Sequence, residues 1–113
     1  EMTFLAIDAQ KNLFTLQKSQ LQFEQTLIMS RVNSLTKQIG FYEANFNEQH
    51  ENDDVDIEDD AFYKNLQRQE AYLETRQDSL DSQISALDNE ISSMKNLVNS
   101  NIKTSCSLNL IGG

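Results

Sequence analysis

Few residues of this chain combine the types and spacing that chemistry requires. His50 is the only histidine, and we interpret it as a solvated residue of an acidic loop rather than a general base or metal ligand. Cys106 is the only cysteine, so no internal disulfide can form. It stands among serine and threonine near the C-terminus. We interpret it as a small side chain of a tail, with an intermolecular disulfide or a lipid attachment as the alternatives.

The most concentrated chemical feature is a run of eight acidic residues: Glu48, Glu51, Asp53, Asp54, Asp56, Glu58, Asp59 and Asp60. Asp54, Asp56 and Glu58 alternate as the first calcium ligands of an EF-hand loop do. That loop also needs glycine at its sixth position and glutamate at its twelfth, where this chain has Asp59 and Asn65. We therefore expect no specific calcium site. The run is interpreted as a solvated acidic turn, with a docking patch for a basic partner as the alternative.

The overall charge argues against several function classes. The net charge is −9, and outside the acidic run ten acidic residues nearly balance nine Lys and Arg. With no basic stripe to neutralise phosphates, we do not expect nucleic-acid binding. No stretch approaches the roughly 20 apolar residues of a transmembrane helix. The start of the chain lacks the basic region of a secretory signal, so we expect a cytoplasmic protein or one exported without a cleaved signal.

The scarcity of chain-breaking residues predicts a few long elements. The chain contains no proline and only three glycines, Gly40, Gly112 and Gly113, and these two residue types are the strongest turn signals. Hydrophobic residues make up 38% of the chain, which suits a narrow seam better than a thick core.

Apolar residues recur with alternating steps of four and three in both halves, which is typical of coiled-coil helices. The expected seam comprises Ile28, Val32, Leu35, Ile39, Tyr42 and Phe46 in the first half, and Leu66, Leu73, Leu80, Ile84, Leu87, Ile91, Met94 and Val98 in the second. We predict an all-α fold, an antiparallel two-helix coiled-coil hairpin. Its parts are a helix over about 3–47, an acidic connecting loop over 48–58, a helix over 59–103 and a short apolar C-terminal tail over 104–113.

Local details refine this hairpin. Gly40 lies inside the first heptad run without disturbing it, so we expect the helix to continue through it. The carboxylates of Asp59 or Asp60 suit the start of the second helix, where free N–H groups need acceptors. If the loop is centred near residue 53, residue i pairs with about residue 108 − i. We therefore expect Leu80 and Leu87 opposite the middle of the first helix, near Val32 and Ile28.

The hairpin has no pocket that excludes water, which catalysis usually requires, so we expect no enzyme, no cofactor and no small-molecule substrate. The first helix instead carries more apolar residues than one seam uses, and such a helix is buried by more than one neighbour. The expected assembly interface contains Phe4, Leu5, Ile7, Leu13, Leu16, Phe23 and Leu27, with Leu108, Leu110 and Ile111 of the tail. The expected partners are copies of the same chain. The alternative is an adaptor or secretion-chaperone-like module that grips a different helical protein.

The predicted architecture resembles that of bacterial type III secretion needle, inner-rod and filament subunits. Those proteins are small helical hairpins without cleaved signals, and they polymerise. The resemblance covers most of the chain and is one of architecture, with no shared motif. It implies a self-assembling structural subunit. The hairpin is also similar to those of type VII secretion, which carry a Trp-x-Gly turn at mid-chain, where this chain has Gly40 with aromatic neighbours but no tryptophan.

Overall fold

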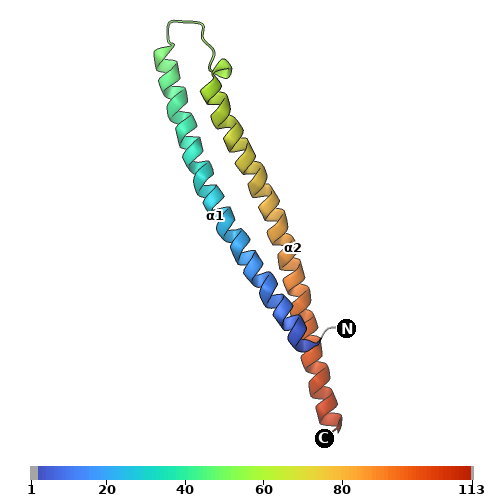
Figure 1. The fold of residues 1–113 in the computed structure, drawn as a ribbon. Coiled ribbons are helices and arrows are strands. Elements are labelled where there is room, and N and C mark those ends of the chain that lie inside the picture. Colours follow the sequence, from blue (N-terminus) through green and yellow to red (C-terminus); the bar gives the residue numbers. More distant parts are fainter. Residues whose placement is uncertain (1–2, 113) are drawn as a thin grey trace. The chain divides into compact units, whose positions relative to one another are not determined.

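The computed structural model describes the backbone of residues 3–112 and the side chains of residues 3–103. This part of the chain forms two long helices, α1 (Phe4–Gln49) and α2 (Ala61–Gly112), with a single 3₁₀ turn, η1 (Ile57–Asp59), before α2 and no strand. The two helices pack against each other as a helical hairpin (Figure 1). The predicted all-α hairpin is therefore confirmed.

Each long helix begins at a residue whose side chain accepts a backbone hydrogen bond. The hydroxyl of Thr3 accepts the N–H of Ala6 at 3.2 Å, which caps α1. One carboxylate oxygen of Asp60 accepts the N–H of Tyr63 at 2.9 Å, which caps α2. Asp56 caps η1 in the same way, accepting the N–H of Glu58 at 3.0 Å. Each bond satisfies one of the N–H groups that a helix start leaves without an intrahelical partner.

The helix ends differ from the expected ones mainly at the C-terminus. The backbone of α2 stays helical to Gly112, through the segment 104–112 that we expected to form a separate tail. This segment contains neither proline nor glycine before Gly112, so nothing in it interrupts the helical hydrogen bonds. At the other end of the hairpin, α1 continues to Gln49, two residues past its expected end.

The hairpin divides into two compact units, and unit 2 is Glu24–Leu80. Its core consists of the buried residues Ile28, Leu35, Phe46, Tyr63, Leu66 and Leu80 and the half-buried residues Val32, Ile39, Tyr42 and Leu73. Leu80 has no exposed surface. Two polar pairs join the helices beside this core. The Thr36 hydroxyl donates to Glu70 at 2.8 Å, and the Arg76 guanidinium donates to Glu24 at 2.9 and 3.0 Å. The seam therefore combines apolar packing with satisfied polar contacts.

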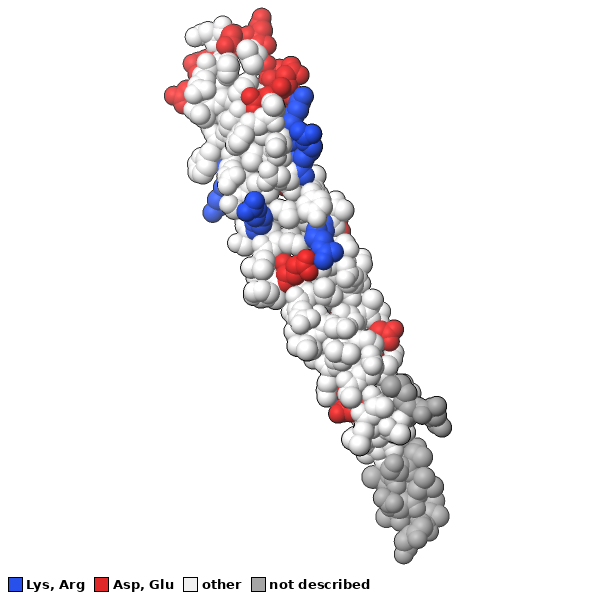
Figure 2. All heavy atoms as spheres, in the orientation of Figure 1, with Lys and Arg blue, Asp and Glu red and all other residues white. Residues whose placement is uncertain are grey.

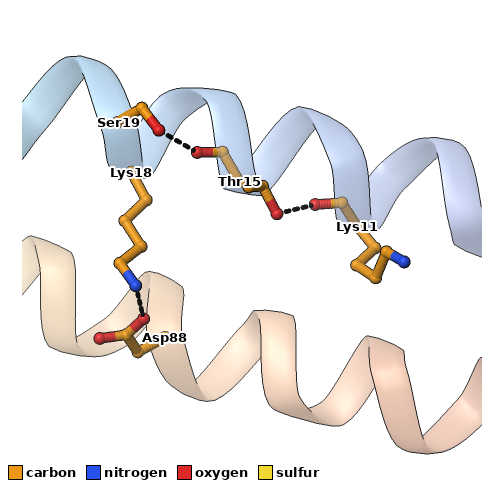
Figure 3. Close-up of polar contacts among 5 residues, drawn as sticks. All are labelled: Lys11, Thr15, Lys18, Ser19 and Asp88. Atoms are coloured by element: carbon orange, nitrogen blue, oxygen red, sulfur yellow. Dashed lines mark hydrogen bonds and ion pairs between the residues drawn. The ribbon is translucent and has the colours of Figure 1, made fainter.

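Unit 1 consists of Glu1–Phe23 and Asp81–Gly113. Its core contains the buried residues Ile7, Ile91 and Val98 and the half-buried residues Phe14, Leu21, Ile84, Leu87 and Met94. Lys18 extends from α1 to form an ion pair with Asp88 of α2 (Figure 3). The intervening seam positions of α1 in this unit, Lys11 and Lys18, are polar. The seam of unit 1 is therefore thinner in apolar residues than that of unit 2.

The register of the helices is close to the expected one. Lys18 pairs with Asp88, Thr36 with Glu70 and Glu43 with Tyr63, so the residue numbers add to 106 in each pair. The expected sum was about 108. Next to the loop, Asp60 at the start of α2 lies beside Tyr42, seven residues before the last residue of α1. Leu87 lines a groove together with Leu21, one heptad before the expected neighbour Ile28.

Candidate interaction surfaces

His50 takes part in the structure of the loop. Its Nδ1 lies 2.9 Å from a carboxylate oxygen of Asp53, and its ring packs on Phe46 with centroids 4.3 Å apart. The hydrogen bond with His50, followed by that from the Val55 N–H, lowers the pKa of Asp53. These contacts hold the turn after α1. Among residues 3–103, no three His, Cys, Asp or Glu side chains are grouped to hold a metal ion. The side chain of Cys106 lies outside the described residues.

A set of tyrosine–carboxylate bonds joins the two helices next to this loop. The Tyr42 hydroxyl donates to Asp60 at 2.7 Å, and the Tyr63 hydroxyl donates to Glu43 at 2.7 Å. The bond from Tyr42 and the N–H of Tyr63 lower the pKa of Asp60. The hydrogen bond to Asp60 raises the pKa of Tyr42, and the hydrogen bond to Glu43 raises the pKa of Tyr63 to about 12. Both tyrosines therefore remain neutral donors well above neutral pH.

An aromatic groove, defined by Phe41, Tyr42, Phe62 and Leu66, opens beside these bonds. Gln38 and Asn45 complete its lining, and its volume is about 480 Å³. Phe41 is 76% exposed and Phe62 57% exposed. Phe41 was not predicted as an interface residue, although it lies fourteen residues, or two heptads, after Leu27 and therefore on the same side of α1.

The second exposed apolar surface is the side of α1 that faces away from α2 in unit 1, called here the outer face. Its residues Ala6, Ala9, Leu13, Leu16, Gln20 and Phe23 again follow alternating steps of three and four. Leu13 is 47% exposed, Leu16 56% and Phe23 66%. This second heptad stripe lies on the side of the helix opposite the seam, because its positions fall between the seam positions of each heptad. In unit 2, Leu27 continues the same spacing and is also exposed.

The outer face carries no charge. The charged residues in the segment 3–23 are Asp8, Lys11 and Lys18, and none belongs to the stripe. Lys11 pairs with Asp8, and Lys18 reaches across to Asp88 of α2. The nearby hydroxyls are also satisfied, since Thr15 and Ser19 donate to carbonyl oxygens of the preceding turns (Figure 3). The outer face therefore presents apolar side chains and side-chain amides to a partner.

The other residues of the expected assembly interface fall into three groups, which are exposed, buried or outside the described residues. Phe4 and Leu5 are exposed, as expected for a contact surface. The prediction that Ile7 belongs to the assembly interface is wrong, because only 4% of this residue is exposed and it belongs to the core of unit 1. It lies seven residues before Phe14, so the seam extends to Ile7, a continuation that the polar seam positions Lys11 and Lys18 obscure in the sequence. The side chains of Leu108, Leu110 and Ile111 lie outside the described residues.

Further exposed apolar residues were not predicted as contact sites. They are Val55, Tyr72, Leu97 and Ile102, together with the groove residues Phe41 and Phe62. Leu97 and Ile102 each adjoin a seam position of α2, and Tyr72 adjoins Leu73, so the heptad spacing alone could have assigned them to the flanks of the seam. In the described residues no helix is sufficiently long and apolar to pass through a membrane.

No protein-family model, curated protein or solved structure matches this chain.

Proposed function

We propose that this chain is a structural subunit that assembles with copies of itself through the outer face of α1, into a homo-oligomeric bundle or an extracellular filament. The main support is the uncharged apolar stripe that contains Leu13, Leu16 and Phe23, about half of each of which is exposed. A stripe of this kind is unusual on the surface of a monomer. No catalytic role is part of the proposal.

The absence of charge favours a copy of the chain as the partner. A face without Lys, Arg, Asp or Glu provides no ion pair to select a charged surface, and a desolvated charge opposite it would remain unpaired. A second outer face offers matching leucines, a matching phenylalanine and the side-chain amide of Gln20. Such amides donate and accept hydrogen bonds with equal ease, so two copies can satisfy each other.

The energetics favour contacts with more than one neighbour. Complete burial of a large apolar side chain contributes roughly 1.5–3 kcal/mol, and half of this remains for a half-exposed one. Leu13, Leu16 and Phe23 together then contribute on the order of 2–5 kcal/mol, against an association cost of about 4–15 kcal/mol. One such contact is too weak for a stable dimer. A subunit that contacts several copies, in a bundle or filament, gains the same contribution repeatedly.

A groove in unit 1 offers a second place for such a neighbour. It lies between the helices, has a volume of about 400 Å³ and is lined by Gln17, Gln20, Leu21, Gln83, Ala86 and Leu87. None of these residues is charged, and Gln20 also belongs to the outer face. A neighbouring helix that extends from the outer face into this groove would cover the half-buried seam residues Leu21 and Leu87.

The test is the mass of the purified chain across micromolar concentrations, measured by sedimentation velocity and light scattering. We expect species larger than a monomer. Leu16→Glu combined with Phe23→Glu should convert them to monomers, because each substitution places a charge in the contact. Circular dichroism of this variant should keep its helical signal, since both residues face away from the seam.

A matched control adds the same charge elsewhere in unit 1. Ser85→Glu combined with Asn89→Glu changes two exposed residues of α2 and should leave the assembly mass unchanged. A wild-type chain that sediments as a monomer over the whole range would reject self-assembly. The adaptor function, in which the same outer face binds a different helical protein, would then replace it.

A further inference from the structure

The aromatic groove of unit 2 is separate from the outer face in unit 1 and differs from it in chemistry. The exposed rings of Phe41 and Phe62 form its walls, and the amides of Gln38 and Asn45 lie at its margin. Exposed aromatic side chains with polar groups around them are typical of the anchoring pockets of protein interfaces. The groove is therefore suited to receive apolar side chains of a partner.

The groove is held in shape by contacts within the hairpin. The rings of Tyr42 and Phe62 have centroids 4.9 Å apart, and Tyr42 also packs on Tyr63 at 6.5 Å. The Tyr42 hydroxyl is bonded to Asp60, whose carboxylate caps α2. These contacts order Tyr42 and Phe62 before any partner arrives, which reduces the entropy lost on binding.

The groove is acidic on the side of the loop. The segment 38–63 contains nine Asp and Glu residues, with Lys37 and Lys64 immediately outside it, and Figure 2 shows acidic side chains gathered over the loop between α1 and α2. In the described part of the chain, Glu51 and Asp54 form no ion pair. The negative potential of this region attracts a basic partner and repels nucleic acid and anionic membranes.

We propose that this groove is the docking site for a basic amphipathic helix of another protein. Its apolar side chains would enter between Phe41 and Phe62, and its Lys and Arg residues would lie against the acidic loop. A second copy of this chain matches less well, because its three longest segments without acidic residues, 9–23, 25–42 and 91–113, each carry only two Lys or Arg. The proposal does not depend on self-assembly through the outer face.

A synthetic amphipathic helix of lysine and leucine, about 18 residues long, serves as the probe. We expect saturable, one-to-one binding by calorimetry, weakened by salt. Phe41→Ser should weaken binding about tenfold, because it removes one apolar anchor. Tyr72→Ser, which changes another strongly exposed aromatic residue of the same unit, is the matched control and should leave binding unchanged.

Two further comparisons separate docking from general charge attraction. Glu51→Gln combined with Asp54→Asn should weaken binding of the probe. A peptide of the same composition without an apolar face should bind the wild-type chain far less tightly than the probe does. Equal binding of both peptides, or equal effects of Phe41→Ser and Tyr72→Ser, would overturn the proposal.

The measurements are repeated in the Leu16→Glu and Phe23→Glu variant. Binding should persist there, which distinguishes this site from the outer face. Binding that appears only after the assembly is dispersed would show that a second copy occupies the groove, and would also overturn the proposal.

Discussion

The Tyr42 hydroxyl donates a hydrogen bond of 2.7 Å to Asp60, and the same carboxylate oxygen accepts the N–H of Tyr63 at 2.9 Å. One side chain thus ends the loop, starts α2 and ties that start to α1. Asp60→Ala should therefore lower the free energy of unfolding more than Tyr42→Phe, which removes the bond between the helices but keeps the cap. Urea unfolding followed by circular dichroism measures both. Equal losses would mean that the cap contributes little.

The Asp60 carboxylate also predicts the behaviour of the hairpin in acid. Its pKa is lowered by the bond from Tyr42 and the N–H of Tyr63, so the folded state favours the ionised form. This contribution is complete above the ordinary carboxyl pKa of about 4 and disappears as the pH falls through the lowered value. Asp60→Asn should flatten the dependence of stability on pH in that range. An unchanged acid profile in this variant would contradict the assignment.

The Tyr63–Glu43 bond predicts a loss of stability in alkali. Glu43 raises the pKa of Tyr63 to about 12, because a neutral hydroxyl is needed to donate to the carboxylate. The resulting stabilisation is complete below the ordinary tyrosine pKa of about 10 and is lost as the pH rises towards 12. Ultraviolet titration of tyrosinate should show a late-titrating group that is absent in Tyr63→Phe. A titration that is the same in both proteins would disprove the bond.

Two leucines of the seam should differ in their cost of removal. Leu80 has no exposed surface, so Leu80→Ala should lower the free energy of unfolding by about 2–5 kcal/mol. Leu87 is only half-buried beside the groove of unit 1, so Leu87→Ala should cost about half as much, since less apolar surface is lost. Chemical unfolding of the two variants gives the comparison, ideally in the background of the monomeric outer-face variant. A greater loss for Leu87→Ala would indicate that an assembled neighbour covers it.

Gly40 is a site where the hairpin can be stabilised. It lies inside α1, and a Cβ built there meets no atom within 4 Å. Gly40→Ala should raise the free energy of unfolding by about 1 kcal/mol, because alanine loses less backbone entropy in a helix. Thermal unfolding measures the gain. A decrease would mean that the glycine has a role in the neighbouring groove that Phe41 and Tyr42 line.

Several features follow from the order of amino acids because they are local. The heptad steps through Ile28, Leu35, Leu80 and Ile91 require no more than the pitch of a helix, and they predicted which residues would share a side. Because the chain contains no proline and a helix tolerates Gly40, neither helix is interrupted. The concentration of carboxylates predicted where the chain turns, and an aspartate there was the natural cap.

Other features depend on contacts between residues distant in sequence, and only the tertiary structure decided them. When one helix slides along the other by a whole heptad, its apolar residues still face the partner helix. A heptad pattern therefore does not select the register. The hydrogen bond between Tyr42 and Asp60 is one of the contacts that define the register in the folded hairpin. The side of α1 to which Ile7 belongs was likewise hidden, because Lys11 and Lys18 occupy seam positions. Lys11 pairs with Asp8 of its own helix, whereas Lys18 pairs with Asp88 only when the hairpin is folded.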